Sequence, residues 1–90
     1  MLEIVPTNSF KRDLKKYIHK KDIIEELNGV IELIATRKPL PPAKKDYNLV
    51  GNYTKCRECH VKNDVLLIYK VEEKSKSLFL ARFGSHSELF

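Results

Sequence analysis

The stretch that decides the fold reads Val65-Leu66-Leu67-Ile68-Tyr69-Lys70-Val71. It is rich in β-branched and aromatic side chains and contains neither glycine nor proline, which is typical of a β-strand. Its nearly continuous apolar character indicates a strand at the centre of a sheet. Two polar segments flank it, residues 58–64 and residues 82–90. Side chains at the ends of neighbouring strands can meet in space, so we expect an active face built on a rigid sheet.

The remaining strands are predicted on both sides of this stretch. Residues 2–5 predict a first strand that ends at Pro6, and residues 52–60 predict a second. The central stretch belongs to a third strand at 64–72, and a fourth follows at 77–83. The polar residues 73–76 between these last two are typical of a hairpin turn.

A first amphipathic helix is predicted directly after Pro6, with N-cap candidates at residues 7–9. Its apolar residues recur at helical spacing and predict one buried stripe, formed by Phe10, Leu14, Tyr17 and Ile18. The opposite face is basic and carries Lys11, Arg12, Lys15, Lys16, Lys20 and Lys21. Such a face is either a solvated surface or one that attracts phosphates, and phosphate binding would depend strongly on salt.

A second helix is predicted from Asp22, which has Glu25 at capping-box spacing. Its buried stripe consists of Ile23, Leu27, Val30, Ile31 and Ile34. Because only Lys21 and Asp22 separate the two helices, we expect an αα-hairpin on one face of the sheet. The predicted fold class is therefore α+β, in the order β-α-α-β-β-β, with a small antiparallel sheet and an N-terminal αα-hairpin.

Composition limits the possible classes of protein. The 90 residues, 42% of them hydrophobic, predict a single domain over residues 1–90. No apolar run is long enough for a membrane span, and residues 1–5 do not resemble a secretory signal. We therefore expect a cytoplasmic protein with reduced thiols. The net charge of +5 favours nucleic acid or an acidic protein as the partner.

The segment Cys56-Arg57-Glu58-Cys59-His60 has the spacing of a c-type haem attachment site, and it could also begin a zinc site or a redox pair. Haem attachment requires export, and zinc would need further ligands at a recognisable spacing. In a regular strand, residues 56 and 59 point to opposite faces. We interpret both cysteines as strand residues and predict no metal and no cofactor.

Strand alternation places Glu58 and His60 on one face, and Arg57 and Cys59 on the other. In the fourth strand it separates two sets of alternating residues, Phe79, Ala81 and Phe83 against Leu78, Leu80 and Arg82. We expect the phenylalanine side to face the core, so we expect Arg82 on the open face. Gly84 would permit a sharp turn that brings His86 to the same edge as Asp64.

The segment between the helices and the second strand contains Pro39, Pro41 and Pro42, which predict an extended loop. Lys44, Lys45 and Tyr47 follow them. Loops fixed by proline often carry ligand contacts.

Three motifs resemble the YafQ branch of the RelE/ParE superfamily of bacterial toxins. Lys45-Asp46-Tyr47-Asn48-Leu49-Val50-Gly51 is similar to K-D-H-x-L-x-G. Arg57-Glu58-Cys59-His60-Val61-Lys62-Asn63-Asp64 is similar to R-[DE]-x-H-[VI]-x-P-D. Gly84-Ser85-His86-Ser87-Glu88-Leu89-Phe90 is similar to G-[ST]-H-x-x-L-F. Tyr47 and Asn63 depart from the family pattern, which has His and Pro at these positions.

The resemblance implies a ribosome-dependent mRNA endoribonuclease, the toxin of a type II toxin–antitoxin pair. It implies His60, Asp64 and His86 as catalytic residues and Phe90 as the terminal aromatic. The expected RNA-binding residues are Lys44, Lys45, Tyr47, Glu58, Arg82 and Phe90. The expected partners are an acidic antitoxin and mRNA on the ribosome, with a monomeric free toxin and no membrane.

Imidazole and carboxylate groups suit cleavage without a metal ion. His60 or Asp64 could accept the proton of a 2′-OH, and His86 could protonate the leaving 5′-oxygen, or the roles could be exchanged. Two alternatives stay open. One is a ParE-like toxin that binds gyrase, and the other is an RNA- or ribosome-binding module without catalysis.

Overall fold

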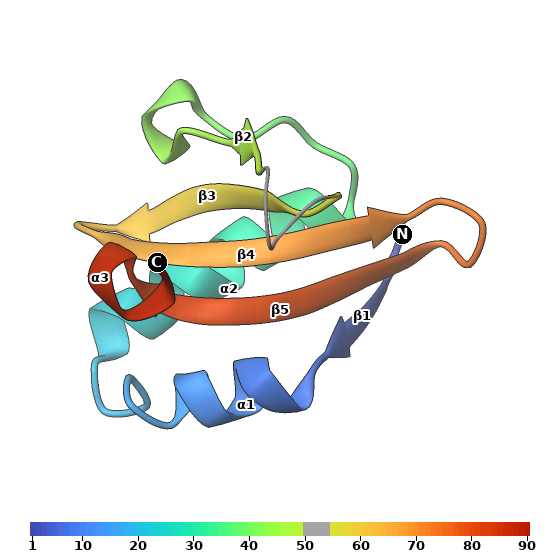
Figure 1. The fold of residues 1–90 in the computed structure, drawn as a ribbon. Helices are drawn as coiled ribbons and strands as arrows, with labels where there is room; N and C mark the ends of the chain where they lie inside the picture. The colour runs from blue at the N-terminus through green and yellow to red at the C-terminus, as the bar shows by residue number, and fades with distance from the viewer. Residues whose placement is uncertain (50–54) are drawn as a thin grey trace.

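The computed structural model describes residues 1–49 and 55–90. β4 (Val65–Glu72) is the central strand that the sequence predicts, and it is paired with β3 (Arg57–Lys62) on one side and β5 (Ser77–Ser85) on the other. Both pairings are antiparallel (Figure 1). Three consecutive residues, Leu66, Leu67 and Ile68, are at most 1% exposed. Both faces of β4 are therefore covered.

The sheet is mixed, so the prediction of an antiparallel sheet is wrong for one strand. Its order is β1-β5-β4-β3-β2, and β1 (Glu3–Pro6) pairs with β5 in parallel. The two helices follow β1 and carry the chain across one face of the sheet before the hairpin strands begin. A connection of this length allows β1 and β5 to run in the same direction.

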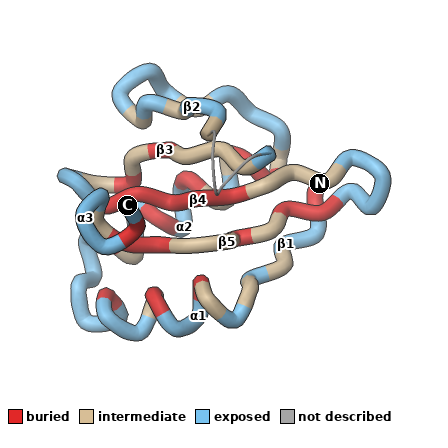
Figure 2. Tube along the Cα trace, viewed as in Figure 1, coloured by how far each residue is buried: buried red, intermediate tan, exposed pale blue. Residues whose placement is uncertain are grey.

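Two helices, α1 (Asn8–Leu14) and α2 (Lys21–Ala35), pack against one face of the sheet, as the sequence predicts (Figures 1 and 2). Their buried side chains include Phe10, Leu27 and Val30. From the sheet, residues such as Leu67 and Phe83 complete this core. A third, short helix, α3 (His86–Leu89), lies at the C-terminus.

α1 is shorter than the sequence predicts. Thr7 is its N-cap, as expected, because the Thr7 side chain accepts a hydrogen bond from the Phe10 amide at 3.2 Å. The helix ends at Leu14, and residues 15–19 form turns. These turns place Tyr17 in the core but leave Ile18 60% exposed. The expectation that Ile18 is buried is therefore wrong, since the helical spacing ends before it.

The N-cap of α2 lies two residues before the predicted Asp22. The N-cap is Lys20, which makes no side-chain capping bond. The Asp22 carboxylate instead accepts from the Ile23 amide at 2.9 Å and lies 3.2 Å from Lys62 Nζ on β3. This ion pair connects the start of α2 to the sheet.

A β-bulge in β5 changes which side chains of that strand face the core, so the expected assignment of faces is wrong. Ile68 is opposite Arg82 and Tyr69 is opposite Leu80, so Ala81 is the extra residue. Leu78, Leu80 and Phe83 consequently all join the core below the helices. Phe79 is opposite Lys70, outside that core, which contradicts the expectation that the phenylalanines share one face. Arg82 does lie on the open face, but the bulge places it there.

The second predicted strand, 52–60, is found only in part. β3 begins at Arg57, and residues 50–54 lie outside the described residues. The loop after α2 is less extended than expected, since it contains the 3₁₀ helix η1 (Pro42–Lys44) and the short strand β2 (Tyr47–Asn48). β2 pairs antiparallel with β3. Sequence pattern does not reveal a two-residue strand, because alternation needs more residues.

The two cysteines lie on opposite faces, as predicted. Cys59 is fully buried below the helices, and Cys56 packs near Leu66 and Ile68 on the other side. Both are free thiols. Burial raises the pKa of the Cys59 thiol to about 12, which makes it unreactive. Within residues 1–49 and 55–90, no helix is both long and apolar enough to cross a membrane.

Candidate active site

The open face of the sheet carries the predicted site residues of β3. Glu58 is opposite Ile68, and His60 is opposite Leu66. Residues directly opposite in an antiparallel pair share a face, and Leu66 and Ile68 form an apolar cluster outside the helix-covered core. Glu58 and His60 therefore point away from the helices, as strand alternation predicts.

Tyr47 extends this surface by one strand. It is opposite Glu58 in the β2–β3 pairing and is 55% exposed. The preceding residue fixes it, because Asp46 Oδ1 accepts from the Tyr69 hydroxyl at 2.7 Å and from Arg57 Nε at 3.0 Å. Burial and the bond to Asp46 raise the pKa of Tyr69. Asp46 thus has a structural role that the sequence analysis did not assign.

Lys44 and Lys45 lie beside His60, around a depression of about 320 Å³. Lys44 Nζ is already engaged, since it donates to Glu26 Oε2 at 2.7 Å and to the Val61 carbonyl at 2.8 Å. Lys45 has a left-handed backbone with φ of 47°. Lys44 therefore connects α2 to β3 and also lines this depression.

Asp64 lies in the two-residue turn between β3 and β4 and is exposed. Its neighbour Asn63 has a φ of 55°. Asparagine tolerates this left-handed conformation, whereas proline is fixed near −65°. A proline at position 63 could not adopt this turn, so the departure from the family pattern has a structural reason.

His86 is the first residue of α3 and Phe90 is its C-cap, and their ring centroids lie 4.9 Å apart. α3 is attached to the open face through Leu89, which is buried against Leu66 and Ile68. Phe90 is 54% exposed.

The strand register brings the three predicted catalytic residues to one end of the sheet. His60, Leu66 and Gly84 lie in line across β3, β4 and β5. Two strand spacings separate the outer members of this row, about 10 Å. Val65 pairs with Ser85, so the turn carrying Asp64 adjoins the start of α3 and His86.

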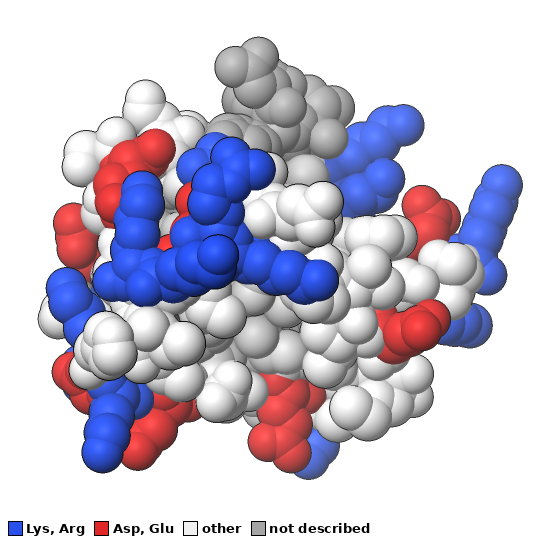
Figure 3. Space-filling model, turned by 90° about the horizontal axis from the view of Figure 1, so that it is seen from below, with Lys and Arg blue, Asp and Glu red and all other residues white. Residues whose placement is uncertain are grey.

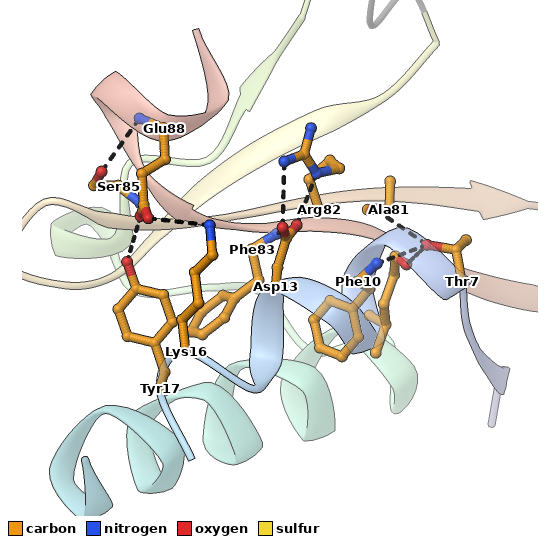
Figure 4. A network of polar contacts seen from close by, with 11 residues as sticks. Thr7, Phe10, Asp13, Lys16, Tyr17, Ala81, Arg82, Phe83, Ser85 and Glu88 are labelled. Carbon is orange, nitrogen blue, oxygen red and sulfur yellow. Dashed lines mark hydrogen bonds and ion pairs between the residues drawn. The ribbon is translucent and has the colours of Figure 1, made fainter. Parts of the chain in front are cut away.

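Arg82 lies further along β5, and its guanidinium contacts α1. Arg82 Nε donates to Asp13 Oδ2 at 2.7 Å, and a second guanidinium nitrogen lies 3.2 Å from Asp13 Oδ1 (Figure 4). Asp13 also accepts from the Phe83 amide at 3.0 Å and is only 6% exposed. The ion pair with Asp13 fixes the position of the Arg82 guanidinium. The expected contact of Arg82 with phosphate remains a prediction.

The carboxylate of Glu88 connects α3 to the rest of the chain. Hydrogen bonds from the Ser85 amide and the Tyr17 hydroxyl hold the pKa of Glu88 at about 2. Burial and the bond to Glu88 raise the pKa of Tyr17 to about 12. Ser85 and Glu88 form a capping box at the start of α3.

The expected role of Gly84 is corrected by this arrangement. Gly84 lies inside β5 and does not make a sharp turn. A Cβ atom at this position would be 3.0 Å from Glu88 Oε1. A side chain at position 84 would therefore require the Glu88 carboxylate, which lies over the strand, to shift.

Sequence analysis missed Asp13, Tyr17 and Glu88 as residues that build the site. Ser85 and Glu88 have the S-x-x-E spacing of a capping box, a signal that the sequence carries. Asp13 gave a signal too, since it lies on the buried side of α1 between Phe10 and Tyr17. Among the described residues, no group of three His, Cys, Asp or Glu side chains is placed to hold a metal ion.

The family model described as "Bacterial toxin of type II toxin-antitoxin system, YafQ" matches residues 2–90. The chain belongs to the YafQ family. The mRNA interferase toxin YafQ of Escherichia coli K12 is 30% identical over 89 residues, which cover 98% of this chain and 95% of that toxin. The resemblance inferred from the three motifs is therefore confirmed.

Solved structures of similar toxins share the fold over the whole chain. A metal-bound toxin from Helicobacter pylori is 42% identical with a TM-score of 0.91, and 100% of each chain is covered. In the Escherichia coli DinJ–YafQ complex, the matched chain is 31% identical with a TM-score of 0.85, covering 100% of this chain and 99% of that one. The small α+β fold expected for a YafQ toxin is confirmed, with the parallel β1 as the correction.

Basic side chains of this YafQ family member gather over the α1 side of the molecule (Figure 3). The exposed members on α1 and the following turns are Lys11, Arg12, Lys15, Lys16 and Lys20. Tyr17 and Asp13 lie on the inner side of the same segment and are buried. The segment formed by α1 and the following turns thus exposes positive charge on its outer side and contacts β5 and α3 with its inner side.

Replacement of Asp13 by alanine should destabilise the protein by about 2 to 3 kcal/mol, because the Phe83 amide and Arg82 both lose a buried acceptor. Urea denaturation measures this loss. Glu73→Ala is the matched control, since it breaks an exposed ion pair with Arg37 and should leave the free energy of unfolding almost unchanged. Equal effects of the two substitutions would contradict the assigned role of Asp13.

Acidification should release α3 while the sheet stays folded. The folded-state pKa of Glu88, about 2, lies below its ordinary value of 4.5, so its contacts stabilise α3 fully above pH 4.5 and weaken as the pH falls toward 2. The amide NMR signals of Ser85 and Phe90 should shift in this range, while those of β4 should not. In Glu88→Gln this transition should be absent, and its persistence there would refute the assignment.

Proposed function

We propose that this YafQ family member is an mRNA interferase, an endoribonuclease that cuts mRNA on the ribosome and thereby inhibits translation. The observation that supports the proposal is the strand pairing of His60 with Leu66 and of Val65 with Ser85, next to Asp64 and His86, at one end of an open sheet face. The name of the Escherichia coli relative, mRNA interferase toxin, supports it.

The residues suit cleavage by the neighbouring 2′-OH of the RNA. His60 or Asp64 accepts the 2′-OH proton, and the 2′-oxygen then forms a bond to phosphorus. The bond from phosphorus to the 5′-oxygen breaks, and His86 donates the proton that this oxygen takes up. Each transfer by a positioned side chain contributes roughly 100- to 10,000-fold in rate.

The RNA would be held by aromatic and basic groups around this centre. Phe90 and Tyr47 are both more than half exposed and offer faces on which unpaired bases stack. Lys45, beside His60, offers positive charge to neighbouring phosphates, and Lys44 would contact them from its ion pair with Glu26. Two further RNA contacts are assigned on the open face, to Glu58 beside His60 and to Arg82.

An acidic antitoxin is proposed as the protein partner, in the same cytoplasm. The Escherichia coli relative forms a DinJ–YafQ toxin–antitoxin complex. The net charge of +5 would speed association with an acidic protein through long-range attraction. We assign its inhibitory segment to the open face, over His60, Asp64 and His86, with the free toxin a monomer.

His86→Ala should abolish growth arrest on overexpression and lower mRNA cleavage on translating ribosomes by at least about 100-fold, since the proton donor is lost. The matched control is His19→Ala, which removes an exposed histidine in the turns between α1 and α2. That variant should keep wild-type cleavage. Circular dichroism establishes that both variants are folded, and full toxicity of folded His86→Ala would exclude His86 from the reaction.

Cleavage should not require a divalent metal ion. Naked RNA at high enzyme concentration is the substrate for this test, because the ribosome itself needs magnesium. Cleavage rates with and without EDTA should agree, since every proposed proton transfer uses a side chain of the chain itself. A loss of cleavage that zinc or copper restores would overturn the metal-free mechanism, and the metal-bound relative makes this comparison informative.

A further inference from the structure

α3 is too short to hold its own position. It contains four residues, and isolated helices shorter than about 12 to 15 residues are marginal in water. It nevertheless carries His86 and ends against Phe90, two residues of the proposed site. Their placement must therefore come from contacts between α3 and the rest of the chain.

The carboxylate of Glu88 makes three polar contacts that position α3. Glu88 Oε1 accepts from the Ser85 amide at 2.8 Å and from the Tyr17 hydroxyl at 2.5 Å (Figure 4). Glu88 Oε2 lies 3.6 Å from Lys16 Nζ. Ser85 Oγ in turn accepts from the Glu88 amide at 3.3 Å. The carboxylate thus joins α3 to its own start and to the segment after α1.

The donor on the other side is rigidly placed. Tyr17 is 7% exposed, and its ring packs against Phe83 with centroids 5.1 Å apart. The ring of Phe83 contacts Phe10 on α1 as well. Gly84 leaves the space in which the Glu88 carboxylate lies, 3.0 Å from where a Cβ atom would be. The buried Tyr17 therefore fixes the donor of the hydrogen bond, and the missing side chain of Gly84 leaves space for the Glu88 carboxylate that accepts it.

We propose that Tyr17 and Glu88 are positioning residues of this toxin: their hydrogen bond holds α3 so that His86 and Phe90 face the RNA. The roles of His86 and Phe90 rest on the function proposed above. Tyr17 and Glu88 touch neither the RNA nor the reacting atoms, and they act only through the placement of α3.

The same contacts contribute little to the core. Glu88 has a side chain that is 36% exposed, and it is not part of either apolar cluster. Leu89 is buried against Leu66 and Ile68 without taking part in the contacts of Glu88. Loss of the carboxylate should therefore change the orientation of α3 and leave the sheet and the packing of α1 and α2 against it in place.

Glu88→Ala should lower kcat for mRNA cleavage by about 10- to 100-fold, since small displacements of a catalytic group have effects of this size. KM should rise by a smaller factor, because Phe90 loses its placement together with His86. Tyr17→Phe keeps the packed ring and should lower kcat by a smaller factor in the same direction. Glu88→Gln retains an acceptor for Tyr17 and Ser85 and should recover most of the lost activity. Glu73→Ala, which breaks an exposed ion pair in the β4–β5 turn, is the matched control and should be unchanged.

A second measurement does not depend on cleavage. In wild type, NMR contacts between the His86 and Phe90 rings and a protected Phe90 amide should be present, since that amide donates to the His86 carbonyl at 2.9 Å. In Glu88→Ala these contacts and this protection should be lost, while β4 amides remain protected. If the wild-type protein does not cleave mRNA, the proposed function is refuted. The NMR comparison then tests by itself whether Glu88 holds α3 in place. Unchanged kcat in folded Glu88→Ala, or an unchanged α3 in its spectra, would overturn the positioning role.

Discussion

Burial of β4 on both faces is the constraint on which the rest of this structure depends. Leu67 faces the helices, while Leu66 and Ile68 face the other way, and all three are at most 1% exposed. α1 and α2 cover only one face. The other is covered in part by Leu89 of α3. The need to cover an apolar strand therefore brings the C-terminal segment, with His86 and Phe90, onto the open face beside His60.

The polar contacts that refine this arrangement come from the N-terminal helical segment. Asp13 and Tyr17 both belong to its inner side, and they bind β5 and α3 respectively. The outer side of the same segment is basic and exposed. A single segment thus combines placement of the site with a surface suited to an acidic partner. This explains why a chain of 90 residues can build a site from segments at both of its ends.

The structure shows where residues of the YafQ sequence motifs lie in the fold. Tyr47, Glu58 and His60 of these motifs lie on the open face, and Tyr47 and Asn63 are the departures from the family pattern. The left-handed backbone of Asn63 shows that this departure changes the turn and not only one side chain. Tyr47 remains exposed next to Glu58, so an aromatic group is kept where the family has an imidazole.

The sequence by itself determined the central strand, the two helices and the three site motifs, because each depends on local spacing or residue type. It also placed Glu58 and His60 on one face and Cys59 on the other. Only the tertiary structure decided the rest. The Ala81 bulge exchanged the expected faces of Phe79 and Leu80, and no local pattern marks a bulge that pairing with β4 imposes. Likewise, the partners of Arg82 and Glu88 are Asp13 and Tyr17, about 70 residues away in the chain. Such contacts exist only after the core has brought both ends of the chain together.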